Sequence, residues 1–265
     1  MELHNRAEEF QRLGMGLAAI SYDSPELLKT VAAKRGITFP LLSDTGSEVI
    51  RRYGILNTSV APDQRSYGIP HPGTFILDAE GRVTARFFEA SYQQRYTVSS
   101  IAVKIGSPLS GVDRDATRSE TPHLVVTAFT TDAQVAPGTR FSLVLDIAPK
   151  TDMHVYAPGQ DNYQTVALKL DGQPSLTAHP IDYPASEIYV FRPLDERVKV
   201  YQKPFRLVQD VTVPVTPEIR ALSKEPEAAL TIRGALAYQA CDHATCFPPA
   251  DVPLTWSVKL KPLEQ

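Results

Sequence analysis

The two cysteines of the chain, Cys241 and Cys246, are the residues whose type and spacing carry the clearest chemistry. Two cysteines are too few to staple a fold of 265 residues, but they can form one redox-active disulfide. On either side of a tight turn between strands, their Cα atoms would come within the roughly 4.4–6.8 Å that a disulfide requires. Closing so small a loop stabilises a fold by only about 2 kcal/mol. The pair therefore favours thiol-disulfide exchange over an inert structural link.

The residues around the pair have mostly structural interpretations. Aromatic and proline neighbours are expected to pack in the core and the hairpin: Tyr238, Phe247, Pro248 and Trp256. Asp242 and His243 are expected in a solvated turn, where a histidine cation would lower a nearby thiol pKa and a carboxylate would raise it. His154 is expected to be a packed strand histidine. A zinc site needs four ligands, and Cys241, Cys246 and His243 supply three at most, so no metal or other cofactor is expected.

Several other function classes are excluded by the sequence. It contains no G-x-S-x-G, no phosphate-binding glycine loop and no H-E-x-x-H, so hydrolase and transferase chemistry has no support. The 27 basic and 30 acidic residues leave a formal charge of -3 and no basic segment, which argues against nucleic-acid or anionic-membrane partners. No apolar stretch reaches 18 residues, so we expect no membrane insertion, and the N-terminus lacks signal-peptide features.

The first part of the chain, residues 1–105, has the pattern of an α/β domain. The order of elements is α-β-α-α-β-β-α. The expected elements are a helix over 2–13, a strand over 15–22, a helix from Pro25 to near Gly36, a short helix over 45–53, a hairpin over 74–88 and a closing helix over 91–105. Ser24-Pro25-Glu26 gives the second of these helices a capping residue, a proline at the first position and an early acid.

The rest of the chain changes character. Residues 106–121 contain few apolar residues and several turn formers, which is typical of a linker. Residues 122–265 contain short alternating apolar runs separated by turn signals, which predict an antiparallel β-sandwich. The fold class is therefore a two-domain chain, α/β followed by all-β.

The run Tyr67-Gly-Ile-Pro-His-Pro-Gly-Thr-Phe-Ile-Leu-Asp, preceded by Ile20-Ser-Tyr-Asp-Ser-Pro and Phe39-Pro-Leu-Leu-Ser-Asp, carries a family signal. The first domain resembles the alkyl hydroperoxide reductase/thiol-specific antioxidant (AhpC/TSA) branch of the thioredoxin-like fold. The resemblance implies a cis peptide bond at Pro72, beside the position of the family's active site.

The AhpC/TSA resemblance also implies a first strand leading into a redox cysteine, and this sequence has neither. No cysteine precedes Cys241, so the first domain has no thiolate with which to act as a thiol peroxidase. We expect that the chain starts downstream of the true gene start; a degenerate scaffold domain is the alternative. The missing strand would lie between the strands at 15–22 and 74–78, and its absence leaves unpaired edges through which a dimer could form.

The run Ala235-Leu-Ala-Tyr-Gln-Ala-Cys-Asp-His-Ala-Thr-Cys-Phe-Pro-Pro carries a second family signal, with Met153-His-Val-Tyr-Ala-Pro-Gly and Ser186-Glu-Ile-Tyr upstream. The second domain resembles the immunoglobulin-like N-terminal domain of the thiol:disulfide interchange protein DsbD. The resemblance implies that Cys241 and Cys246 form a reversible disulfide that relays electrons between thioredoxin-like partners. It also implies that Cys246 faces the partner, that Cys241 resolves the mixed disulfide, and that the protein works in the periplasm or cell envelope.

The DsbD resemblance implies a cap loop over the cysteines, and the segment 191–197 occupies that place. The candidate cap residues are Phe191, Leu194, Asp195 and Glu196. An ordinary polar loop between strands is the alternative. The turn between the cysteines has four residues, one fewer than in the best-known family member.

Two functions follow from these observations. The first is thiol-disulfide exchange without a cofactor, serving a thioredoxin-like or peroxiredoxin-like partner domain. The second is a protein-binding module whose disulfide is inert. The reduction potential separates them, because structural disulfides usually lie below about -300 mV.

Overall fold

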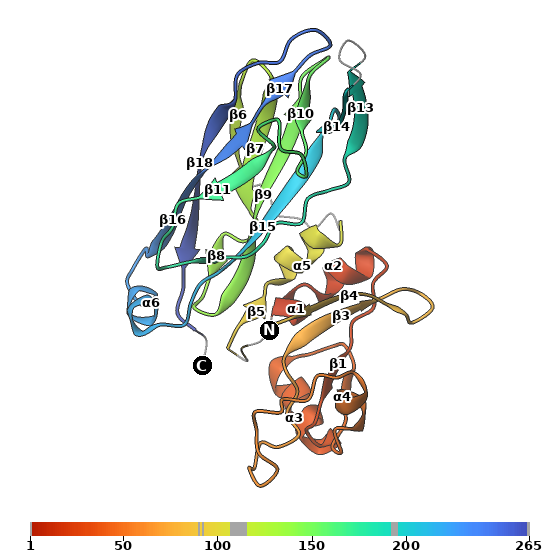
Figure 1. The fold of residues 1–265 in the computed structure, drawn as a ribbon. Coiled ribbons are helices and arrows are strands. Elements are labelled where there is room, and N and C mark those ends of the chain that lie inside the picture. The colour runs from red at the N-terminus through yellow and green to blue at the C-terminus, as the bar shows by residue number, and fades with distance from the viewer. Residues whose placement is uncertain (1, 90, 92, 107–115, 192–195, 264–265) are drawn as a thin grey trace. The chain divides into compact units, whose positions relative to one another are not determined.

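The computed structural model describes residues 2–89, 91, 93–106, 116–191 and 196–263 (Figure 1). The chain divides into two compact units, Met1–Ile101 and Ala102–Gln265. The first unit is a small α/β region and the second is rich in β-strands, as the sequence predicts.

The helices of the first unit begin and end where local signals place them. They are α1 (Glu2–Asn5), α2 (Ala7–Arg12), α3 (Pro25–Arg35) and α4 (Glu48–Arg52), and α5 (Val98–Lys104) lies at the division between the units. The Ser24 side chain accepts a hydrogen bond from the Leu27 amide, and Gly36 ends α3 with a φ of 66°, so the predicted start and stop of this helix are confirmed. The predicted helix over 2–13 is divided into α1 and α2 at Arg6, whose guanidinium bonds Glu9 and Ser99.

Four of the described strands of the first unit form two separate two-stranded sheets. Strand β1 (Ala19–Ser21) pairs in parallel with β2 (Leu41–Ser43), and β3 (Gly73–Leu77) pairs antiparallel with β4 (Val83–Phe88). A short strand β5 (Arg95–Tyr96) follows. In the part of the unit that the structure describes, β1 and β3 do not pair with each other, which agrees with the expected gap between them. Dimerisation through these edges stays a prediction.

The expected cis bond at Pro72 is wrong. Every peptide bond among the described residues is trans, including the one between His71 and Pro72. An X-Pro bond favours trans by about 0.5–1 kcal/mol unless surrounding contacts select the cis form.

The described residues of the second unit form three sheets, with one helix, α6, after the end of α5. The strands are β6 (Thr117–Glu120), β7 (Leu124–Thr130), β8 (Gln134–Val135), β9 (Thr139–Pro149), β10 (His154–Tyr156), β11 (Ala167–Leu170), β12 (Thr177–Ala178), β13 (Glu187–Phe191), β14 (Glu196–Tyr201), β15 (Phe205–Thr212), β16 (Ala229–Tyr238), β17 (Ala240–Cys241) and β18 (Ala250–Leu260), with α6 (Pro217–Leu222) after β15. Their orders within the unit are β12-β15-β9-β7-β6, β11-β16-β18-β8 and β13-β14-β10-β17. Residues 117–120, expected in the linker, form β6 because their backbone pairs with β7.

One apolar core holds the sandwich together. Residues of β18 alternate strictly, and Val252, Leu254, Trp256, Val258 and Leu260 are buried while the residues between them are exposed. This period of two places one side of the strand against the core. The inward residues of β7, β9 and β15 join the same cluster. The alternating pattern read from the sequence therefore predicted the architecture of this unit correctly.

Candidate functional site

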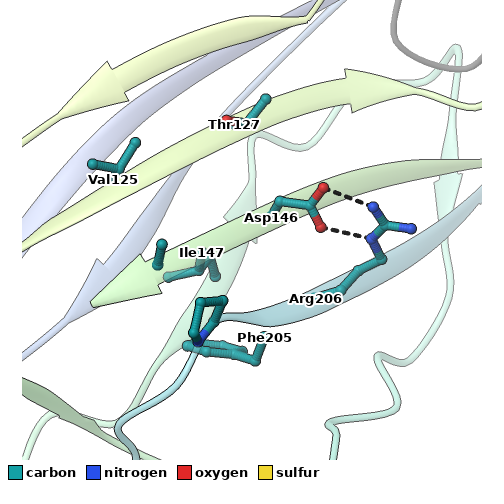
Figure 2. Close-up of a pocket in the computed structure, with 8 residues that line it drawn as sticks. Val125, Thr127, Asp146, Ile147, Phe205 and Arg206 are labelled. Carbon is teal, nitrogen blue, oxygen red and sulfur yellow. Dashed lines mark hydrogen bonds and ion pairs between the residues drawn. The ribbon is translucent and has the colours of Figure 1, made fainter. Parts of the chain in front are cut away.

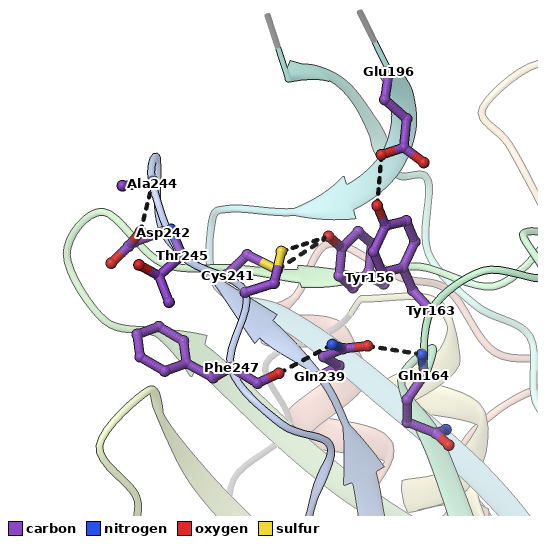
Figure 3. The surroundings of a disulfide bond; sticks show 11 residues. Tyr156, Tyr163, Gln164, Glu196, Gln239, Cys241, Asp242, Ala244, Thr245 and Phe247 are labelled. Carbon is purple, nitrogen blue, oxygen red and sulfur yellow. Dashed lines mark hydrogen bonds between the residues drawn. A yellow bond between two sulfur atoms is a disulfide. The ribbon is translucent and has the colours of Figure 1, made fainter. Parts of the chain in front are cut away.

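Cys241 and Cys246 face each other across a tight hairpin. The Phe247 amide donates to the Ala240 carbonyl and the Asp242 amide donates to the Thr245 carbonyl, both at 2.9 Å. These two bonds bracket the cysteines, which makes them a non-hydrogen-bonded cross-strand pair, the position where side chains come closest. The Cα atoms are 4.1 Å apart and the two sulfurs are bonded (Figure 3). The register of the hairpin therefore creates the disulfide.

The turn between the cysteines is closed by its own first residue. Asp242 Oδ1 accepts hydrogen bonds from the backbone amides of Ala244, at 2.7 Å, and Thr245, at 2.6 Å. These bonds, with smaller contributions from His243 and His154, lower the pKa of Asp242. The carboxylate is thus ionised and holds the turn, while His243 is exposed at its tip. Both residues therefore lie in the turn between the cysteines.

The two cysteines differ in their exposure to solvent. Cys241 is 1% exposed, whereas Cys246 is an exposed residue. Cys241 belongs to β17, which pairs with β10, while Cys246 lies on the returning arm of the hairpin. The order in which the two cysteines are attacked stays a prediction.

The disulfide lies on the side of its sheet that faces away from the sandwich core. Cys241 is in register with His154 of β10, so their side chains project from the same face, and Tyr156 two residues on projects there too. Val155, which lies between His154 and Tyr156, and its partner Ala240 project into the core. The cysteine side of the sheet has its own small cluster: Tyr156, Val198, Val200 and Cys241, with Tyr163 and Tyr189 packed against it.

Tyr156 contacts both sulfurs. Its hydroxyl oxygen lies 3.0 Å from Cys241 Sγ and 3.3 Å from Cys246 Sγ (Figure 3). Because a disulfide sulfur carries no hydrogen, the phenol is the donor in this state. Burial, reinforced by Tyr163, raises the pKa of Tyr156, so the phenol stays protonated. The sequence did not predict Tyr156 as a site residue, although it lies in the segment Met153-His-Val-Tyr that carries the DsbD resemblance.

A second tyrosine lies flat against the first. The rings of Tyr156 and Tyr163 are stacked, with centroids 4.0 Å apart and an interplanar angle of 9°. The Tyr163 hydroxyl donates to Glu196 Oε2 at 2.5 Å, and this bond to a carboxylate raises the pKa of Tyr163. Tyr163 was also missed, because it lies in an irregular segment between β10 and β11 with no chemical motif.

His154 packs in the sheet, as predicted. It is 4% exposed, and its ring lies 4.5 Å from that of Tyr189 and 5.8 Å from that of Tyr156. Burial lowers the pKa of His154, and the Asp242 carboxylate partly opposes that shift. A pocket of about 350 Å³ opens beside it, lined by Asp152, Met153, His154, Tyr189, Gln202 and His243.

The remaining predicted site residues fall into two groups. Tyr238 and Trp256 are buried in the sandwich core, and the Tyr238 hydroxyl donates to Thr121 rather than to a sulfur. Phe247 packs partly against that core, with its carbonyl accepting from the Gln239 side chain at 3.0 Å, and Pro248 is exposed.

The candidate cap loop is only partly covered by the structure. Phe191 ends β13 and Glu196 begins β14, where it bonds Tyr163. Leu194 and Asp195 lie outside the described residues. The cap role stays a prediction.

A second pocket, of about 300 Å³, lies over β7, β9 and β15 (Figure 2). Its most prominent feature is the Arg206 guanidinium, which donates two hydrogen bonds to Asp146, at 2.6 and 2.7 Å. Its other lining residues are mostly apolar: Val125, Thr127, Ile147, Ala148, Pro204 and Phe205. Its lining contains no cysteine and no histidine, so it offers no groups for thiol-disulfide exchange.

The described residues contain no group of three or more histidine, cysteine, aspartate or glutamate residues arranged to hold a metal ion. None of the helices that the structure describes is both long enough and apolar enough to cross a bilayer.

Known proteins resemble the two parts of the chain separately. Residues 1–86 match the AhpC/TSA family. Alkyl hydroperoxide reductase E from Mycobacterium tuberculosis and from Mycobacterium bovis is 34% identical over 90 residues, which is 33% of this chain and 53% of each relative. The chain thus spans about half the length of the curated relatives it matches.

Among solved structures, the N-terminal periplasmic domain of ScsB from Proteus mirabilis is similar with a TM-score of 0.37 and 13% identity. The similarity covers 55% of this chain and 51% of that one. Residues 121–254, half of the chain, match the family of the N-terminal part of the thiol:disulfide interchange protein DsbD, and they include the whole cysteine hairpin. The chain therefore belongs to the DsbD N-terminal family, fused to an AhpC/TSA-like region.

Proposed function

We propose that the chain exchanges electrons with a thioredoxin-like partner through a reversible Cys241–Cys246 disulfide. One observation carries the proposal: an exposed cysteine is bonded to a buried one, and a protonated phenol points at both sulfurs. A purely structural link needs neither the exposed cysteine nor the donor.

The exchange proceeds in two displacements. A partner thiolate attacks Cys246 Sγ, a bond forms between the partner sulfur and Cys246, and Cys241 leaves as a thiolate with the electron pair of the broken S–S bond. The second thiolate of the partner then attacks the partner's own sulfur and releases Cys246. The partner dithiol becomes a disulfide, and the pair gains two electrons and two protons. In the reverse direction Cys246 attacks an acceptor disulfide and Cys241 resolves the intermediate.

Tyr156 has a role in the first displacement. The leaving sulfur of Cys241 is buried, and a developing negative charge there is costly without a hydrogen-bond donor. The Tyr156 hydroxyl, 3.0 Å away, supplies that donor. A hydrogen bond to a thiolate is charge-assisted and lowers its basicity, and a less basic thiolate leaves faster.

The partner domain is part of the proposal. The AhpC/TSA-like region contributes no cysteine, since both lie in the second unit. We propose that the acceptor is a peroxiredoxin-like or thioredoxin-like domain that carries its own redox cysteine.

The experiment is a redox titration of the full chain against a glutathione or dithiothreitol series, read by thiol alkylation and mass. A midpoint above about -270 mV, near that of thioredoxin, supports the relay. A midpoint below about -300 mV is the value of a structural disulfide and favours the alternative, a binding module with an inert bond.

A further inference from the structure

The Tyr156 phenol has a single hydrogen, so its orientation decides whether a sulfur receives it. Its ring is held on one side by His154, whose ring meets it at an interplanar angle of 85°, and on another by the parallel ring of Tyr163. His154 is part of β10 itself. Tyr163 belongs to the segment after β10, which needs anchors of its own to stay against Tyr156.

Two such anchors are present. The Tyr163 hydroxyl donates its own hydrogen to Glu196 at 2.5 Å, across 33 positions of sequence (Figure 3). The next residue, Gln164, donates its backbone amide to Gln239 Oε1 at 3.1 Å, and Gln239 also bonds the carbonyl of Phe247 on the hairpin. The segment is thus tied to β14 on one side and to the hairpin on the other.

The bond to Glu196 also fixes where hydrogens point. With its hydrogen committed to the carboxylate, Tyr163 can only accept a hydrogen bond from Tyr156. Tyr156 therefore remains a donor, and the anchored Tyr163 ring holds its hydroxyl within reach of the sulfurs.

We propose that Glu196, acting through Tyr163, is a positioning residue that holds the Tyr156 phenol on the two sulfurs and so sets the rate at which Cys241 leaves. The inference rests on the proposed function, because it concerns the same exchange reaction.

Glu196 could instead act on the exchange through its charge, and removing it would then change the rate in the opposite direction. The titratable groups facing this site are Tyr156, Tyr163, Tyr189, His154 and Glu196, with Asp242 and His243 on the hairpin. A carboxylate that acted only by its charge would repel the leaving thiolate, so its removal would speed the exchange. A carboxylate that acts by positioning slows the exchange when it is removed.

The experiment measures the rate of reduction of the full chain by dithiothreitol at fixed pH, together with the apparent thiol pKa from the pH profile of alkylation. We expect Tyr156→Phe to slow reduction by about tenfold, the size of a hydrogen bond to a charged group. Tyr163→Phe keeps the stacked ring but loses the bond to Glu196, and Glu196→Ala loses the same bond. Each should slow reduction by about threefold, because the hydrogen bond from Tyr156 to the sulfurs would be weakened rather than lost. The apparent thiol pKa should rise in all three.

The double variant Tyr156→Phe/Tyr163→Phe is decisive. If Tyr163 acts through Tyr156, the second change has no further effect on the rate. The matched control is Glu187→Gln, which removes a carboxylate from the neighbouring strand β13, where it pairs with Lys203 and bonds no tyrosine. This control should reduce at the wild-type rate.

Three outcomes would overturn the inference: a full additional effect of Tyr163→Phe in the double variant, faster reduction of Glu196→Ala, or an equal loss in the control. Failure of the proposed function looks different. In that case the wild-type disulfide itself would resist reduction by dithiothreitol in the range expected for a relay.

Discussion

The two units of the chain start a helix in the same way. Helix α3 of the first unit begins with Ser24-Pro25-Glu26, and α6 of the second begins with Thr216-Pro217-Glu218. In each, the hydroxyl accepts the amide of the residue three positions on, at 3.3 Å. In each, hydrogen bonds from its own backbone amide and from the capping hydroxyl lower the pKa of the glutamate. Identical local chemistry therefore specifies both helices.

The units differ in what those helices pack against. Helix α3 buries Leu28 but leaves Leu27 50% exposed and Val31 38% exposed, whereas Ile219 of the shorter α6 joins the sandwich core. The strands show the same contrast, since β1 and β2 contain no buried residue while β18 buries every second one. Local signals determine where an element forms, and packing determines how firmly it is held. The cysteine pair lies in the firmly packed unit.

The largest expected effect is on the formation of a mixed disulfide, and it compares the two cysteines. Cys241→Ser leaves the exposed Cys246, which should accumulate an unresolved mixed disulfide with glutathione. Cys246→Ser leaves Cys241, which is 1% exposed and should form little. Mass spectrometry of the intact chain after incubation with oxidised glutathione measures both. Equal labelling of the two variants would show that burial does not set the order of attack.

The next effect compares the cores of the two units. Phe141→Ala in the sandwich removes a fully buried ring and should cost about 3–5 kcal/mol of the free energy of unfolding. Phe75→Ala in β3 removes a half-buried ring that contacts Tyr53 and Phe88, and should cost about 1–3 kcal/mol.

Hydrogen exchange resolved by peptide separates the two phenylalanine variants within the full chain. Each change should increase exchange in its own unit. A Phe75→Ala loss as large as that of Phe141→Ala would contradict the view that the first unit is the more loosely packed.

The matched caps give a smaller effect. Ser24→Ala and Thr216→Ala each remove one hydrogen bond to the first turn and should cost about 1 kcal/mol, nearly the same in both units. The measurement is hydrogen exchange in α3 and α6, with Thr216→Ser as the variant that should restore the cap. A much larger loss at one cap than at the other would show that packing, rather than the local bond, dominates there.

The smallest effect concerns pH and the second unit alone. Burial lowers the pKa of His154 in the folded state, so in the window just below its ordinary value of 6.5 the unfolded chain binds the proton more readily. Stability should therefore fall as pH falls through that window. His154→Phe keeps an aromatic ring and should flatten the dependence, which urea unfolding at pH 7 and pH 5.5 measures. The exposed His243→Gln is the control, and an unchanged slope in His154→Phe would refute the assignment.

The sequence predicted the elements better than the site. The bounds of α3, the hairpin of β3 and β4 and the alternation in β18 all follow from local patterns and are confirmed. The cis bond expected at Pro72 is wrong, since the bond is trans, and residues 117–120, expected in the linker, form a strand. The first depends on contacts with neighbours, and the second on pairing with β7 rather than on apolar content.

By itself, the sequence determined the chemical pair. Two cysteines separated by a four-residue turn become cross-strand neighbours in a hairpin, because the register of a short hairpin is fixed by its turn. Only the tertiary structure decided which cysteine is exposed, which side of the sheet the pair occupies, and that Tyr156, Tyr163 and Glu196 gather beside it. Those three residues come from β10, from the segment after it and from β14. Strand pairing over long sequence separations brings them together, and no local pattern encodes that register.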